Sequence, residues 1–292
     1  MRTTLHRTLC GLLAAGLAFA ASTVPNASSK LYLESKNKKN VPVDYIEADS
    51  LEKAPELISI NGEIYELTME DNFDGNDINT DYWERCPEIE RADIGAYWDD
   101  DKSVVKDGNL WLYVDIDDDG VPRTGAIRSK GIFEQTYGYF EARLMLQNTS
   151  GYWGAFWMMC GDVGKVDGWA ESGAEIDIME TGGYPDSVNH AIHWDGYGAD
   201  LKSLKSDAKL KDRDSTELYE GWHTYAFEWT EDEYRFYIDG EMTWHTSRPK
   251  ICKYPGYLKL TTEAGKWTGS LVPEELPDAF RCDWVRVYQK VK

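Results

Sequence analysis

Three acidic side chains lie close together in the segment 173–180, and their spacing suits acid–base chemistry. Glu175 and Asp177 are two residues apart, and Glu180 follows three residues later. Two carboxyl groups held near each other can act as a nucleophile and a general acid, which is how glycosidic bonds are cleaved. A strand that carries acids only for solubility is the alternative that this spacing leaves open.

The spacing of the three acids has a structural consequence. Side chains alternate between the two faces of a strand, so Glu175 and Asp177 share a face. Strict alternation would place Glu180 on the opposite, apolar face, where an unpaired carboxylate is costly. One extra residue around Ile178–Met179, a β-bulge, would return Glu180 to the face of the other two.

Three carboxyl groups on one face should not all ionise freely, so we expect at least one raised pKa. Glycosidic cleavage needs one protonated carboxyl group and one carboxylate. Two glutamates leaning together over an aspartate can approach the separation of about 5–5.5 Å found in retaining enzymes. The segment therefore predicts retention of the anomeric configuration.

The elements that must position these acids are strands. Period-two alternation recurs in the segments 64–69, 110–114, 139–146, 234–238 and 281–288, and Asp239-Gly240 predicts a hairpin turn. No long stretch shows helical periodicity. Ten or more short strands in roughly 230 residues favour one β-sandwich.

The N-terminal segment resembles an export signal. Residues 1–20 combine basic residues with a short apolar run, and Ala18-Phe19-Ala20 predicts cleavage near Ala20. Residues 21–60 are polar, with little periodicity, and we interpret them as a linker or tether before a catalytic domain at 61–292. We expect a secreted, extracellular protein without a membrane span.

Charge and cysteines restrict the partners. The formal net charge of −21, about −23 without the signal, disfavours nucleic acid and anionic lipid. A neutral polysaccharide fits better than a sulfated or uronate-rich one, unless the cleft carries its own basic residues. Cys86, Cys160, Cys252 and Cys282 contain no CxxC pair, which disfavours a zinc site, and we expect one disulfide or none. We also expect a monomer.

The segment 173–180 resembles the E-x-D-x-x-E signature of glycoside hydrolase family 16. Further segments are similar to strands of that family in the same order, so the resemblance covers about residues 64–290: 67–75, 126–130, 137–143, 151–159, 221–229 and 283–288. The six-residue motif, with Met179 as the extra residue, is similar to the laminarinase, agarase and carrageenase branch.

The resemblance implies an all-β, concanavalin-like jelly roll with a concave substrate cleft, and retaining endo-hydrolysis. Carried over by position, Glu175 is the nucleophile and Glu180 the general acid/base. Asp177 is the assisting acid between them.

The resemblance also implies substrate-binding side chains. We expect the aromatic rings of the cleft to stack on sugars, and the candidates are Trp153, Trp157, Trp169, Trp267 and Trp98. A family histidine in this region lies near the acid/base. His190 and His193 have opposite parity in one strand, so only one of them should face the cleft, and we expect it to be His193. Arg128 is expected to reach sugar hydroxyls or the nucleophile. Core packing for Trp157, and structural roles for His193 and Arg128, remain open.

The resemblance requires no cofactor, although many family members hold a structural calcium ion on the convex face. Gly75 and Asp283 would be its ligands here, but Asn72 replaces the usual acid of the opening motif. We expect a neutral β-linked polysaccharide as the substrate, cut by an endo-β-1,3- or β-1,3(1,4)-glucanase. The alternatives are an endo-β-galactanase of the agarase or porphyranase type and a catalytically inactive glycan-binding module.

Overall fold

The computed structural model describes residues 53–91, 94–208 and 214–292. The predicted signal and most of the predicted linker lie outside them. The boundary of the linker at residue 60 is wrong, because Leu57–Ile60 forms β1 and pairs antiparallel with β2 (Glu63–Asp71). Ile58 and Ile60 are buried against Tyr65, so this short strand belongs to the folded domain.

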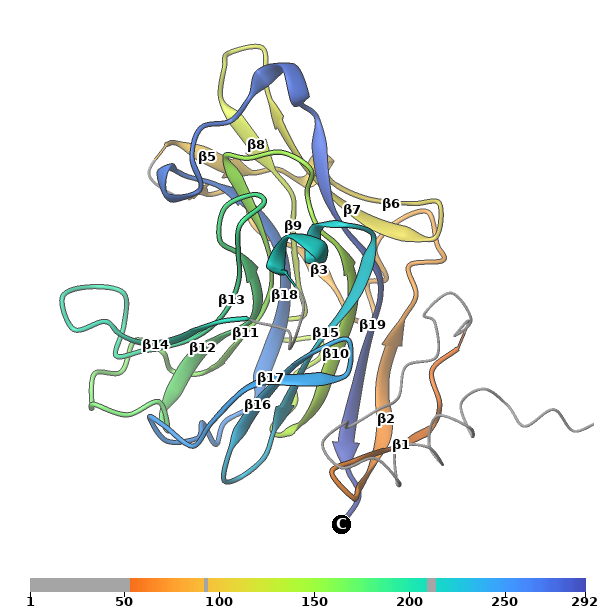
Figure 1. Ribbon diagram of the computed structural model, residues 1–292, viewed down its shortest axis with the longest axis vertical. Helices are drawn as coiled ribbons and strands as arrows, with labels where there is room; N and C mark the ends of the chain where they lie inside the picture. The colour runs from red at the N-terminus through yellow and green to blue at the C-terminus, as the bar shows by residue number, and fades with distance from the viewer. Residues whose placement is uncertain (1–52, 92–93, 209–213) are drawn as a thin grey trace, which may run out of the picture.

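The described chain folds into two sheets, as Figure 1 shows. The sheet that carries the three acids has seven strands. Their order is β14 (Lys202–Asp207), β13 (Val188–Trp194), β12 (Gly173–Thr181), β11 (Tyr152–Gly161), β18 (Gly256–Ala264), β9 (Ala126–Arg128) and β3 (Glu84–Arg85).

The second sheet has twelve strands, with β10 (Gly138–Met145) and β19 (Asp278–Lys290) at its centre. β10 continues outward to β15 (Trp222–Trp229), β16 (Tyr234–Ile238) and β17 (Glu241–Thr246). β19 pairs with β2 and with β7 (Asn109–Ile116), which leads to β6 (Ser103–Lys106), β8 (Pro122–Thr124), β5 (Ala96–Trp98) and β4 (Glu90–Arg91).

The core lies between the two sheets. Phe140 and Leu144 of β10 pack in one apolar cluster with Phe156 and Met158 of β11 and with Ile176 of β12, all fully buried. Each such side chain contributes about 1.5–3 kcal/mol on burial. The alternating inward residues of both sheets thus make one core, and the predicted all-β sandwich is confirmed.

Helical structure is limited to single turns in the described residues. These 3₁₀ turns are η2 (Asp100–Lys102), η3 (Ser215–Tyr219), η4 (Lys266–Thr268) and η5 (Pro273–Glu275). Among the same residues no helix has the length and apolar character needed to cross a bilayer. The four cysteines are buried and none is in a disulfide, which is one of the two outcomes that the sequence allowed.

Candidate active site

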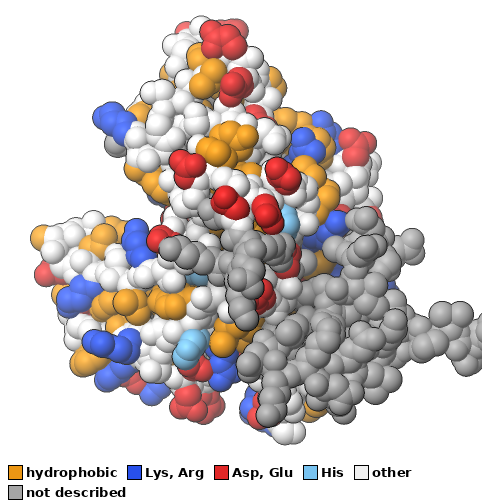
Figure 2. Space-filling view, viewed as in Figure 1, with side chains coloured by type: hydrophobic (Ala, Val, Ile, Leu, Met, Phe, Trp, Pro, Cys, Tyr) orange, Lys and Arg blue, Asp and Glu red, His pale blue; other side chains and the backbone are white. Residues whose placement is uncertain are grey.

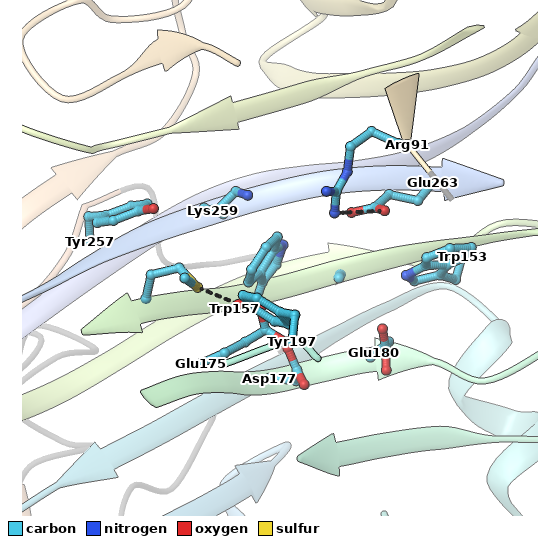
Figure 3. Close-up of a pocket in the computed structure, with 12 residues that line it drawn as sticks. Arg91, Trp153, Trp157, Glu175, Asp177, Glu180, Tyr197, Tyr257, Lys259 and Glu263 are labelled. Carbon is cyan, nitrogen blue, oxygen red and sulfur yellow. Dashed lines mark hydrogen bonds and ion pairs between the residues drawn. The ribbon is translucent and has the colours of Figure 1, made fainter. Parts of the chain in front are cut away.

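A cleft of about 520 Å³ opens over the seven-stranded sheet. Its floor comes from β18, β11 and β12, and Arg91 of β4 and Tyr197 complete its walls (Figure 3). Glu175, Asp177 and Glu180 all line it. The structure therefore brings the three predicted acids to one surface.

A β-bulge in β12 makes this possible. Asp177 pairs with Trp157 of β11 and Met179 with Phe156, so Ile178 has no partner in the register. On the other side, the pairing of β12 with β13 shifts between Asp177 and Glu180. The bulge predicted from parity is confirmed: Ile178 and Met179 are both fully buried, while Glu180 returns to the cleft.

Glu175 is held by a hydroxyl group that the sequence did not predict. Tyr197 Oη donates a hydrogen bond to Glu175 Oε2 at 2.5 Å and lies 3.3 Å from Met159 Sδ. Burial and the neighbouring Glu175 carboxylate raise the pKa of Tyr197, so the phenol stays protonated and remains a donor. This contact fixes one oxygen of Glu175 and leaves the other available to a substrate.

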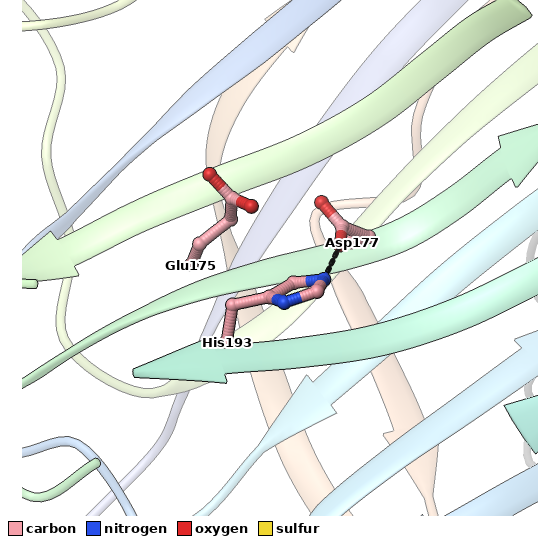
Figure 4. A group of neighbouring side chains, drawn as sticks. All are labelled: Glu175, Asp177 and His193. Carbon is pink, nitrogen blue, oxygen red and sulfur yellow. Dashed lines mark ion pairs between the residues drawn. The ribbon is translucent and has the colours of Figure 1, made fainter. Parts of the chain in front are cut away.

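Asp177 lies beside both Glu175 and His193, as Figure 4 shows. Its Oδ2 is 3.3 Å from His193 Nε2, and His193 Nδ1 is 2.6 Å from Ser203 Oγ. Burial, followed by the charge of Glu175, raises the pKa of Asp177 well above its usual range. The Asp177 carboxyl group therefore binds a proton more readily than an exposed aspartate does.

The two histidines of β13 face opposite sides, as their parity predicted. His190 is fully buried, with its ring nitrogens 2.6 Å from Ile178 O and 2.7 Å from Thr243 Oγ1. His193 lies against Asp177, and it is close enough to Glu175 and Glu180 for their charges to act on its imidazole. Burial lowers the pKa of the His193 imidazole, which favours its neutral form.

Glu180 has the protonation state that a general acid needs. Burial, and then the charge of Asp177, raise the pKa of Glu180 to about 8. Its carboxyl group is therefore protonated at neutral pH. Glu175, Asp177 and His193 offer ligand atoms within 4.8 Å of one another. In the part of the chain that the structure describes, they are the only three His, Cys, Asp or Glu side chains grouped closely enough to share a metal ion.

Three of the predicted tryptophans lie together. Trp153 and Trp157 alternate with Ala155 along β11 and line the cleft floor, each less than a tenth exposed. Trp157 Nε1 donates to Thr261 Oγ1 at 3.0 Å. The ring of Trp267 lies 5.0 Å from that of Trp153 and is half-exposed, so it extends the aromatic surface beyond the floor.

Trp98 and Trp169 do not line this cleft, contrary to expectation. Trp98 is 3% exposed and donates from Nε1 to Thr262 O. Arg91 Cζ and Lys259 Nζ lie 4.4 and 4.5 Å from its ring centroid, so these two cleft cations cover the indole. Trp169 is half-exposed, but it lines a separate pocket with Lys250. The sequence placed both rings near the catalytic sheet. It did not show which neighbouring residues would bury one ring or direct the other out of the cleft.

Arg128 is also absent from the cleft lining. Its Nε donates to Glu84 Oε1 at 2.6 Å, and this ion pair joins β9 to β3, the edge strand of the sheet. The structural role that the sequence left open is therefore the one that the structure shows. Arg128 reaches neither of the two catalytic candidates, Glu175 and Glu180.

Two cations in the cleft were missed. Arg91 Nη2 donates to both carboxylate oxygens of Glu263, at 3.0 and 3.1 Å. Lys259 Nζ lies 3.7 Å from the ring centroid of Trp157, and burial lowers the pKa of this lysine to about 8. Tyr257, Lys259 and Glu263 share one parity in β18, so alternation could have assigned them to the cleft face.

The calcium candidates do not assemble a site in the described residues. Asp283 Oδ2 is 2.5 Å from Arg143 Nη1, so a guanidinium group already neutralises this carboxylate. Neither Gly75 nor Asp283 belongs to a group of three potential side-chain ligands. The side chains alone therefore show no calcium site, and calcium binding at Gly75 and Asp283 stays a prediction.

Comparisons with known proteins agree with this geometry. The family profile "Glycosyl hydrolases family 16" matches residues 91–286. The glucan endo-1,3-β-glucosidase A1 of Niallia circulans is 28% identical over 77% of the chain, and the keratan-sulfate endo-1,4-β-galactosidase of Sphingobacterium multivorum is 28% identical over 56% of it. The catalytic domain of a laminarinase from Thermotoga petrophila RKU-1 superposes with a TM-score of 0.63, at 26% identity over 79% of this chain and all of that one.

The matched lengths are unequal. The chain spans 38% of the Niallia protein and 40% of the Sphingobacterium protein. What those whole proteins do is therefore a guide to this chain rather than a finding about it.

Proposed function

This chain belongs to glycosyl hydrolase family 16, and on that premise we propose that it is a secreted, monomeric endo-hydrolase of β-1,3- or β-1,3(1,4)-glucan that retains the anomeric configuration. One observation carries the proposal: the β12 bulge gathers Glu175, Asp177 and Glu180 on the cleft face, with Glu180 protonated at neutral pH. The glucanase and laminarinase named among the relatives support the choice of glucan.

In the first step, Glu175 attacks the anomeric carbon while Glu180 donates its proton to the leaving glycosidic oxygen. The C–O bond to the leaving sugar breaks as a glycosyl ester forms on Glu175. Tyr197 holds one Glu175 oxygen, so the other can be directed at the sugar. The buried Asp177 keeps a proton near Glu175. This proton makes the Glu175 carboxylate a better leaving group in the second step.

In the second step, the deprotonated Glu180 removes a proton from water. The resulting hydroxide equivalent attacks the same carbon, and the ester bond to Glu175 breaks. Two inversions at one carbon give net retention. Trp153 and Trp157 would position the sugar ring over the acids by stacking.

A second candidate keeps the mechanism and changes the sugar. Arg91 and Lys259 place two cations in the cleft, which is the condition under which the sequence left a charged glycan open. A relative named as a keratan-sulfate endo-1,4-β-galactosidase is as similar in sequence as the glucanase relative. A β-galactan is therefore the alternative substrate.

A panel of polysaccharides tests the proposal. The full chain and its Glu175→Gln variant would be incubated with laminarin, barley β-glucan, agarose and keratan sulfate, and reducing ends measured over time. We expect release from laminarin or β-glucan by the parent protein only. Release from a galactan alone would select the second candidate, and no release from any substrate would contradict both and favour a glycan-binding module.

A further inference from the structure

A second pocket, of about 500 Å³, lies at the open edge of the sandwich. Lys205 of β14 and Trp244 of β17 line it from the edge strands of the two sheets, and Trp169 and Arg248 line it from loops. Figure 2 shows apolar and basic side chains gathered on the part of this face where Figure 1 places β14. The catalytic mechanism uses none of these residues.

The lining of this edge pocket has an unusual charge. Lys205, Arg248 and Lys250 line it, and no aspartate or glutamate does, in a chain of net charge −21. Lys250 lies 3.3 Å from Glu171, whereas Lys205 and Arg248 form no ion pair with any acid of the described residues. Two exposed cations of an acidic protein are thus left facing one concavity, which favours a negatively charged ligand.

The same pocket presents aromatic rings. Trp169 is 49% exposed, and Lys250 Nζ lies 4.4 Å from its ring centroid. Trp244 is partly buried, and Trp194 closes the base of the pocket at 8% exposure. The exposed face of a large indole can stack on the apolar face of a sugar ring.

One residue of the edge pocket, Lys205, lies on the sheet face that carries the acids. Trp157, Asp177, Ala191 and Lys205 are successive cross-strand partners from β11 to β14, so their side chains share the cleft face. β14 is two strands from β12, which is about 10 Å. A glycan chain lying across the strands over the acids would therefore reach Lys205 on leaving the cleft.

We propose that the edge pocket is a distal subsite for a negatively charged sugar unit of the substrate chain, carrying either a sulfate ester or a carboxylate. The indole of Trp169 stacks on the sugar ring, and Lys205, Arg248 and Lys250 pair with the anionic group. This inference rests on the proposed function in taking the cleft as the path of the chain. It adds that the full substrate is an acidic glycan, or a neutral one with acidic substituents.

Binding measurements test the subsite independently of turnover. Isothermal titration of the full chain, made inactive by Glu175→Gln, would use three hexasaccharides: a sulfated β-galactan, hyaluronan for its carboxylates, and neutral laminarihexaose. Adding Arg248→Ser and Lys250→Ser should raise the Kd of at least one anionic hexasaccharide ten-fold or more. The Kd of laminarihexaose should change less than two-fold. The anionic ligand that responds identifies sulfate or carboxylate as the recognised group.

A matched control removes the same charge elsewhere. Lys106→Ser with Lys290→Ser deletes two exposed lysines of the other sheet. This variant should bind every ligand as the parent does, and circular dichroism would show that both variants are folded. Equal losses in the two double variants, or unchanged anionic binding after loss of Arg248 and Lys250, would overturn the proposal. If the affinities change as predicted but the active parent protein hydrolyses none of the polysaccharides, the result would count against the proposed function alone.

Discussion

At the scale of single residues, the roles of the two glutamates differ and can be separated. Glu175→Ala removes the nucleophile and should lower kcat on every substrate by at least about 10³-fold. Glu180→Ala removes only the proton donor, so it should cost about 10²–10⁴-fold on polysaccharide but little on an aryl glycoside with a very good leaving group. Steady-state kinetics on both substrate types would check this, and equal, modest losses for both variants would contradict the assignment.

The pH dependence of activity follows from Glu180. Its pKa is raised to about 8, so the proton needed for the first step is present at neutral pH and is lost as pH rises through about 8. We expect kcat/KM to fall on the alkaline side with that midpoint. The residual activity of the Glu180→Gln variant should not show this alkaline fall. If kcat/KM of the parent protein instead falls near pH 5, Glu180 is not the general acid.

The cleft residues that could be predicted from the sequence are those identified by a short motif or by alternation within one strand. Glu175, Asp177 and Glu180 stand within six residues, and Trp153 and Trp157 share the parity of one strand. Tyr197, Arg91 and Lys259 were missed because they reach the cleft from a loop and from other strands, through pairings that no short motif encodes.

At the scale of elements, β12 needs its extra residue only to correct parity. Deleting Met179 would leave Glu175, Asp177 and the displaced glutamate at regular alternation, all facing the cleft. We therefore expect the deletion to cost about 2–5 kcal/mol of stability, from the lost core side chain. Activity should remain well above that of Glu180→Gln, as measured by reducing-end release.

A matched insertion provides the opposite case. One alanine added after Met179 should turn the glutamate towards the core and remove activity as completely as Glu180→Gln does. If the deletion is as inactive as the insertion, the parity account of the bulge is wrong. Parity could be worked out from the sequence because it depends on one strand, whereas the burial of Trp98 and the pairing of Arg128 with Glu84 depend on neighbouring strands.

At the scale of the whole molecule, two buried carboxyl groups make stability depend on pH. The pKa values of Glu141 and Glu180 are both raised to about 8, chiefly by burial. Because the unfolded chain loses these protons near pH 4.5, the folded state binds more protons between about pH 5 and 8. Stability should therefore fall as pH rises through this window, by on the order of 3 kcal/mol for each group.

Urea unfolding at pH 5.5, 7 and 8.5 would measure this slope. Glu141→Gln should flatten it while leaving activity in place, because Glu141 lies in β10 of the other sheet, away from the cleft. A parent protein that becomes more stable from pH 5.5 to 8.5 would contradict the raised pKa values. The sandwich itself was predictable from alternation over many strands, whereas the edge pocket required the three-dimensional meeting of β14, β17 and two loops.

Retention requires that the bulge hold Glu175 and Glu180 close enough for a double displacement at one carbon. Time-resolved proton NMR of the reducing ends released from the polysaccharide that the protein cleaves tests this most directly. With retention, the β-anomer should appear first and the α-anomer should grow in later by mutarotation. Initial release of the α-anomer would show inversion and contradict the claim.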